Sequence, residues 1–412
     1  MTDFTETIQK YADVLVQVGL DLQAGQRLFI NAPLEARELA LAVTRSAYKA
    51  GAENVHVNWA DPELDKIRLR DGSDEAVKAY PDWVVDGLLQ HTDAGHARMN
   101  ITCADPDFFA EEDPDRLRDM QRARAVKFQP VSERIVTNVA NWNIGMSPHP
   151  AISAKLFPEL SPEEARAKHW ETIFKMCRIE GDDPVQDWKD HISNLVKRAN
   201  YLNEKQFHAL HYQSPVTDLT IGLPDGHLWE TAQLGMKNGT YPVVNIPTEE
   251  VFSLAHRERI DGVVKSTKPL SWNGTIIDNF ILQFSEGDVV SAQAERGQSA
   301  LDTLLSTDDG ARSIGEVALV PHSSPISQSN LLFFNTLYDE NASNHLALGQ
   351  AYRFTLAGGT EMSDEDFNEA GGNSSLVHVD FMMGSGDMDI DGITADGERE
   401  PIFRNGEWAF KV

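Results

Sequence analysis

The feature that most constrains the fold is a strand–helix–strand pattern between residues 27 and 59. Arg27 to Ile30 is a short apolar run, residues 35–50 are rich in Ala and Leu with helical spacing, and Asn54 to Trp59 alternate as a strand does. Connections this short between two strands and a helix are typical of a βαβ unit. The pattern therefore predicts a parallel sheet in the first half of the chain. Helical segments expected at 5–19, 75–90 and 114–126 continue the alternation.

The chain of 412 residues is longer than one ordinary core, since domains usually contain about 100 to 200 residues. Ser161 and Pro162 begin a helical region that runs to about residue 203, because serine is a good N-cap and proline suits the first helical position. After residue 206 the chain is rich in strand-like runs and in turns such as Asn273-Gly274 and Asn405-Gly406.

Two domains follow from this division. We predict an α/β N-terminal domain with a parallel sheet over residues 1–205, which includes a helical bridge from about residue 161. Residues 206–412 are expected to form an α+β catalytic domain with a mostly antiparallel sheet.

The charge balance narrows the possible partners. The chain has 64 acidic and 36 basic residues and a net charge of −28, so nucleic acid and anionic membranes would be repelled, whereas a metal ion or a cationic substrate group would be attracted. The two cysteines, Cys103 and Cys177, are too few for a disulfide framework or a thiolate zinc cluster. With no signal peptide and no long apolar run, we expect a cytoplasmic protein.

His378 and Asp380 stand two residues apart within the apolar run Leu376 to Met382. Side chains two apart on a strand share a face, so an imidazole and a carboxylate would lie side by side among apolar neighbours. A buried carboxylate requires a cation or a proton. A metal site is one interpretation, and a neutral histidine bonded to its neighbouring aspartate is the structural alternative.

Three further acids and a histidine lie next to apolar, strand-like segments in the sequence. Glu249 and Glu250 precede Val251, Glu316 begins an apolar strand, and His345 lies seven residues before Tyr352. If that last segment is helical, His345 and Tyr352 share one side of it. Each has a structural alternative, since adjacent acids are often solvated and Glu316 suits a solvent-facing edge. Together, three carboxylates and two imidazoles are a donor set for a pair of divalent ions: Glu250, Glu316, His345, His378 and Asp380.

Four segments in the same order carry a resemblance to a known family: residues 245–252, 314–316 with 324–327, 339–345 and 373–382. On these segments the chain resembles the aminopeptidase T and aminopeptidase S (PepS-type) two-metal aminopeptidases, the thermophilic metalloprotease family. The similarity extends to the N-terminal half, for example at residues 50–55.

The resemblance implies a site and an activity. It implies that Glu250, Glu316 and Asp380 hold one ion and that Glu316, His345 and His378 hold the other, with Glu316 bridging. Zn, Co or Mn would suit these ligands alike. Tyr352 would be a further ligand or a donor to the tetrahedral intermediate, and Glu249 is our candidate for the proton carrier.

The implied activity is hydrolysis of N-terminal residues from short peptides by a hydroxide held by two divalent ions, in a homodimer. Another two-metal amidohydrolase on the same scaffold and a non-enzymatic two-domain binding protein are the alternatives. A last motif, Asp387 to Glu398, fits the ligand positions of an EF-hand loop, but it follows a strand and precedes a turn, so we interpret it as an acidic β-turn.

Overall fold

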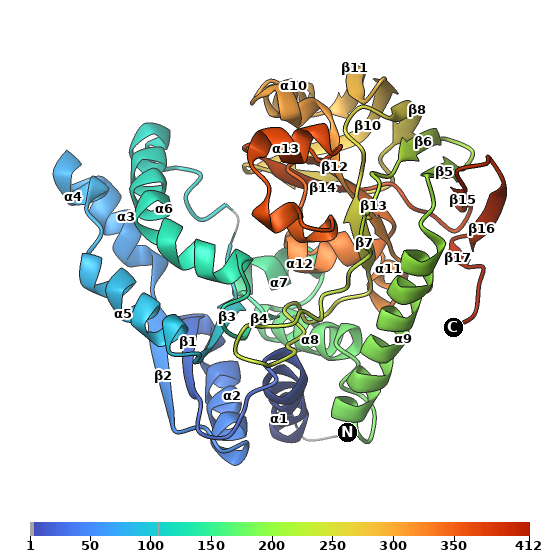
Figure 1. Cartoon of the computed structure of the whole chain (residues 1–412). Coiled ribbons are helices and arrows are strands. Elements are labelled where there is room, and N and C mark those ends of the chain that lie inside the picture. Colours follow the sequence, from blue (N-terminus) through green and yellow to red (C-terminus); the bar gives the residue numbers. More distant parts are fainter. Residues whose placement is uncertain (1–3, 106) are drawn as a thin grey trace. The chain divides into compact units, whose positions relative to one another are not determined.

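The computed structural model describes residues 4–105 and 107–412, and the chain folds into two compact units (Figure 1). The first unit contains the chain up to His191 together with Ala232–Pro247, and the second contains Ile192–Thr231 and Thr248–Val412. Residue 205, where the sequence suggested a boundary, is the last residue of helix α9 (Pro184–Lys205), so α9 begins in one unit and ends in the other.

The first unit contains the parallel sheet that the sequence predicted. Its strand order is β2-β1-β3-β4, and all three strand pairs are parallel. The strands are β1 (Arg27–Pro33), β2 (Asn54–Ala60), β3 (Ala97–Thr102) and β4 (Trp142–Met146). The helices of this unit, before α9, are α1 (Phe4–Val14), α2 (Arg37–Lys49), α3 (Pro62–Asp71), α4 (Asp74–Lys78), α5 (Asp82–Asp93), α6 (Pro114–Val136), α7 (Pro150–Leu156) and α8 (Pro162–Met176).

Alternation along β1 explains how this sheet is covered on both faces. Leu28 and Ile30 are fully buried on the face that α2 covers. Phe29 points to the other face and packs against Val85 of α5 and Val131 of α6. Both faces of the sheet are therefore packed against helices, as in most parallel sheets.

The second unit is built from two antiparallel sheets, in agreement with the α+β prediction. The larger has nine strands, with the order β11-β10-β8-β6-β5-β15-β16-β17 and β9 paired to β10. Its strands are β5 (Ala209–Gln213), β6 (Asp218–Gly222), β8 (Ile260–Lys265), β9 (Leu270–Trp272), β10 (Thr275–Ser285), β11 (Asp288–Arg296), β15 (Asp389–Ile393), β16 (Arg399–Arg404) and β17 (Glu407–Trp408). The predicted turns at Asn273-Gly274 and Asn405-Gly406 connect strands of this sheet.

The smaller sheet of this unit has the order β14-β13-β12-β7. Its strands are β7 (Val251–Leu254), β12 (Ile314–Leu319), β13 (His345–Gly349) and β14 (His378–Met382). Every residue of β7, β12 and β13 is buried, so this sheet lies in the core of the unit. Besides the end of α9 and several short 3-10 helices, the unit contains four short α-helices: α10 (Gln298–Leu305), α11 (Pro325–Ser329), α12 (Thr336–Asp339) and α13 (Asp364–Glu369).

The segment that resembles an EF-hand loop is a β-hairpin. Strand β15 pairs with β16 across a turn at residues 394–397, so the flanking helices that an EF-hand needs are absent from the described residues 384–408. Two of the acids are bound locally, since Asp389 accepts the backbone N–H of Asn405 and Asp391 pairs with Arg404. The acidic turn interpretation is confirmed. No helix in the described part of the chain is long and apolar enough to cross a membrane.

Candidate metal centre

The strand register of the smaller sheet aligns four of the candidate ligands. Glu316 on β12 pairs with Ala347 on β13, and Ala347 pairs with Asp380 on β14. His345 lies two residues before Ala347, and His378 lies two residues before Asp380. Because side chains two apart share a face, all four side chains extend from one face of the sheet.

These residues and Glu250, which directly precedes β7, form two groups that share Glu316. Glu250, Glu316 and His345 each place one ligand atom within 4.8 Å of the others, and so do Glu316, His378 and Asp380. In the first group, Nε2 of His345 lies 3.2 Å from Oε2 of Glu250 and 3.7 Å from Oε1 of Glu316. In the second, Nε2 of His378 lies 3.3 Å from Oδ1 of Asp380 and 3.8 Å from Oε2 of Glu316.

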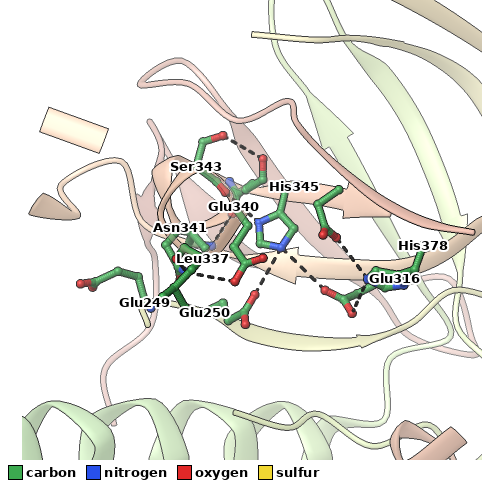
Figure 2. A network of polar contacts seen from close by, with 12 residues as sticks. Glu249, Glu250, Glu316, Leu337, Glu340, Asn341, Ser343, His345 and His378 are labelled. Carbon is green, nitrogen blue, oxygen red and sulfur yellow. Dashed lines mark hydrogen bonds and ion pairs between the residues drawn. The ribbon is translucent and has the colours of Figure 1, made fainter. Parts of the chain in front are cut away.

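Glu316 is therefore the central carboxylate, with one oxygen toward each imidazole (Figure 2). The grouping differs from the one that the resemblance implied, because Glu250 is grouped with His345 and Asp380 with His378. The reason lies in the strands: His378 and Asp380 are neighbours on one face of β14, whereas His345 lies at the start of β13 and reaches Glu250.

Backbone carbonyls orient both imidazoles. Nδ1 of His345 lies 3.2 Å from the carbonyl oxygen of Ser343, and Nδ1 of His378 lies 2.7 Å from that of Gln350. A carbonyl oxygen can only accept, so each Nδ1 carries a proton and each Nε2 is directed at the carboxylates. This is the orientation that a metal-binding histidine requires.

The carboxylates of this cluster accept too few hydrogen bonds from the surrounding protein to satisfy their oxygens. Oε2 of Glu316 and Oδ1 of Asp380 are buried, and apart from the facing Nε2 of His378, at 3.8 and 3.3 Å, neither has a hydrogen-bond partner among the described residues. Burial raises the pKa of Glu316, although His345 and His378 oppose this shift. Burial works against a charged His378, but Asp380 and Glu316 raise its pKa to about 10. Such a cluster needs cations, and its mixed carboxylate and imidazole donors fit borderline divalent ions.

Tyr352 lies beside this cluster, but it is not placed there by a helix. The segment from His345 to Gly349 is strand β13, and Tyr352 follows it at the start of a short 3-10 helix (Arg353–Thr355), so the two residues do not share a helix face. The Tyr352 ring lies 4.7 Å from the His378 ring and stacks at 5.3 Å on Phe354. Although Tyr352 is 41% exposed, partial desolvation of its phenol, followed by the charges of Glu316 and Asp380, raises the pKa of the phenol above the usual value, so the hydroxyl keeps its proton.

Glu249 is not brought together with the other candidates. Its backbone N–H donates to Oδ1 of Asn341 at 2.7 Å, which fixes the start of β7. Figure 2 shows its side chain directed away from His345, whereas that of Glu250 is directed toward it. Adjacent residues of an extended segment point in opposite directions, so only one of the two glutamates can face the cluster.

Glu340 is a site residue that the sequence pattern did not single out. Figure 2 shows it close to His345 and Glu250. Burial and then the negative charges of Glu250 and Asp380 raise its pKa well above the usual value. Glu340 lies within the segment 339–345 that carries the family resemblance, but its place beside Asp339, five residues before His345, is also the pattern of an ordinary solvated turn.

Comparison with known proteins identifies relatives over the full length of the chain. Residues 4–408 match the family described as thermophilic metalloprotease (M29). Aminopeptidase AmpS of Bacillus subtilis (strain 168) is 45% identical over 410 residues, which cover 100% of both chains. Aminopeptidase T of Thermus thermophilus is 41% identical over 408 residues, covering 99% of this chain and 100% of that one.

A solved structure, wild-type AmpT from Thermus thermophilus, superposes with a TM-score of 0.93 at 40% identity and covers 99% of this chain and 100% of that chain. The fold predicted from the sequence is thus also that of a solved relative. From the donor set on the small sheet, the full-length family match and these relatives, we conclude that the chain belongs to the thermophilic metalloprotease family M29.

Proposed function

We propose that this chain is a metal-dependent aminopeptidase that removes N-terminal residues from short peptides. We further propose that Glu250 and His345 hold one divalent ion, that His378 and Asp380 hold a second, and that Glu316 contributes to both. The observation that supports two ions is the central position of Glu316, whose two oxygens face different imidazoles at 3.7 and 3.8 Å. The aminopeptidase relatives support the activity.

The ions could be Zn, Co or Mn, since carboxylate and imidazole ligands suit all three. When bound, such ions would polarise the scissile carbonyl and lower the pKa of a water molecule to near neutral. The chain's own residues would hold the reacting groups in place. The protonated hydroxyl of Tyr352, beside His378, would donate a hydrogen bond to the negative charge that develops on the carbonyl oxygen.

The proton carrier that we expected from the sequence, Glu249, has its carboxylate directed away from the cluster (Figure 2). A general acid or base must be within hydrogen-bond reach of the proton that it transfers, directly or through one water. Glu249 would have to turn toward Glu250 to do so. We therefore assign it a role in fixing the start of β7 through its backbone.

We also propose a homodimer in a reducing compartment such as the cytoplasm. The dimer is what the family resemblance implies. The compartment is supported by the small number of cysteines, since Cys103 and Cys177 are too few for a disulfide framework. Light scattering on the purified protein, expected to give twice the mass of 45.8 kDa, tests the dimer.

The decisive experiment is release of amino acids from free and N-acetylated short peptides, before and after treatment with a chelator and with Zn, Mn or Co added back. Chelator-sensitive release only from free N-termini supports a metal aminopeptidase. Equal cleavage of blocked peptides would exclude an aminopeptidase and favour an amidohydrolase. No turnover with any metal would favour the binding-protein alternative.

A further inference from the structure

A cavity of about 70 Å³ in the second unit reaches the proposed metal centre. This is room for several water-sized groups. One side of the cavity is acidic and includes Glu340 and Asp380. The other side is apolar and includes Leu270, Leu332 and Met382. Among the described residues that line it, none is basic.

The apolar side is formed by three separate segments. Leu270 belongs to β9 and is 7% exposed, and Met382 ends β14 and is 3% exposed. Leu332 and Phe334 belong to the loop between α11 and α12. Burial of an aliphatic side chain against such a wall is favourable, so the wall selects for such a side chain.

The loop that contributes Leu332 is held in place by Asp339. One oxygen of its carboxylate accepts the N–H of Phe333 at 2.7 Å and the other accepts the N–H of Asn335 at 3.0 Å. Between them Phe334 has a φ of 55°, which is rare for an aromatic residue and persists only where the surroundings enforce it. The wall is therefore formed before any substrate binds.

Of the three acids in the cavity, Glu340 is the one available to a ligand. The Asp339 carboxylate is bound to the loop, and Asp380 belongs to the proposed ion site. Glu340 has one long hydrogen bond within the described structure, 3.5 Å from Nδ2 of Asn341. An ammonium group that donates hydrogen bonds to Glu340 would lie at the edge of the metal centre. The α-amino group of a peptide must lie there if the bond that follows its first residue is to be cleaved at the metal centre.

We propose that this cavity binds the first residue of the substrate, with Glu340 binding its α-ammonium group and Leu270, Leu332 and Met382 contacting its side chain. The substrates are then peptides that begin with a medium-sized aliphatic residue such as Leu, Val or Met. Peptides that begin with Asp or Glu are excluded, because a further carboxylate would be placed among Asp339, Glu340 and Asp380. This inference rests on the proposed aminopeptidase function.

The first test compares kcat/KM of the metal-loaded protein for dipeptides X-Gly, where X is Leu, Val, Met, Asp or Glu. Leu-Gly should exceed Glu-Gly by about a hundredfold or more, the scale on which a pocket discriminates. Similar values for both would overturn the proposed pocket but not the aminopeptidase activity. Absence of cleavage of every peptide with every metal would overturn the activity itself.

The second test fills the cavity. Leu332→Trp should lower kcat/KM for Leu-Gly about tenfold or more and that for Ala-Gly less than about threefold, because alanine leaves the added ring room. Leu331→Trp is the matched control, since Leu331 is also half-buried and does not line the cavity. Equal losses on both substrates, or the same effect from both variants, would contradict the assignment.

The third test separates ammonium binding from general damage. Leu-Gly and 4-methylpentanoyl-glycine, which differ only in the amino group, are compared as competitive inhibitors of another peptide's cleavage. The wild type should bind Leu-Gly at least about tenfold more tightly, and Glu340→Gln should make the two nearly equal while the metal content stays constant. An undiminished preference for the amine in Glu340→Gln would overturn the role of Glu340.

Discussion

Glu249 and Glu250 are adjacent in the sequence and both buried, yet only Glu250 faces the imidazole of His345. We expect Glu249→Gln to keep about two ions per chain, Glu250→Gln to keep about one, and Glu316→Gln to keep fewer than one, because Glu316 belongs to both groups. Activity should fall at least about a thousandfold in Glu316→Gln and less than about tenfold in Glu249→Gln. Elemental analysis and kcat measure the two effects.

Glu286→Gln is the control for this series, since Glu286 is exposed in the turn between β10 and β11. If Glu249→Gln were as inactive as Glu316→Gln while keeping its metal, Glu249 would be the proton carrier that the sequence suggested. If Glu316→Gln kept both ions, the shared carboxylate would be refuted.

His169 of α8 makes stability depend on pH. It is fully buried, its Nδ1 lies 2.9 Å from Oγ of Ser153, and burial lowers its pKa from 6.5 to about 4. In the unfolded chain the ring binds a proton below about pH 6.5, but in the folded chain only below about pH 4. Stability from this residue is therefore complete above pH 6.5 and is lost as the pH falls toward 4, by up to about 3 kcal/mol.

His169→Leu should remove this part of the pH dependence. Urea unfolding at about pH 7 and about pH 5 gives the change in unfolding free energy for wild type and variant, and the variant should lose less stability between the two values. The remaining hydrogen bond of Ser153, 3.0 Å to the carbonyl oxygen of His149, leaves its hydroxyl satisfied in the variant. An identical loss in both proteins would mean that His169 does not titrate in this range.

At the scale of elements, the start of α8 was predicted from the sequence and is confirmed in detail. Ser161 and Glu164 form a capping box, in which each backbone N–H donates to the other side chain at 3.1 and 3.4 Å. Ser161→Ala should lower the unfolding free energy by about 1 kcal/mol, the usual loss for an N-cap. Ser299→Ala, at an exposed helical position in α10, should change it little, and equal effects would contradict the cap's contribution.

The sequence predicted the individual helices and strands better than it predicted which of them become neighbours in the fold. The βαβ pattern and the His378–Asp380 strand depend on local spacing, and both are confirmed. The sequence left open whether the segment from His345 to Tyr352 is helical, because strand β13 is set by its pairing with β12 and β14 and not by local spacing. Likewise, the grouping of Glu250 with His345 depends on strand order, which no single segment encodes.

At the scale of the whole molecule, the net charge of −28 should act on substrate binding. An acidic protein raises the local concentration of cations, and salt screens this effect because the Debye length falls from about 30 Å at 0.01 M to about 3 Å at 1 M. The kcat/KM for Leu-Gly amide, a cation at neutral pH, should therefore fall roughly threefold or more between about 0.02 and 0.5 M KCl.

Leu-Gly itself is the matched control, because its free carboxylate makes it neutral overall while the N-terminal residue stays the same. Its kcat/KM should change much less over the same salt range, because the long-range field of the protein attracts a cation but exerts little net force on a neutral molecule. Sucrose in place of salt should affect both substrates equally. A parallel decline for amide and free dipeptide would mean that salt weakens contacts within the site, such as the one proposed for Glu340, and that the overall charge does not steer the substrate.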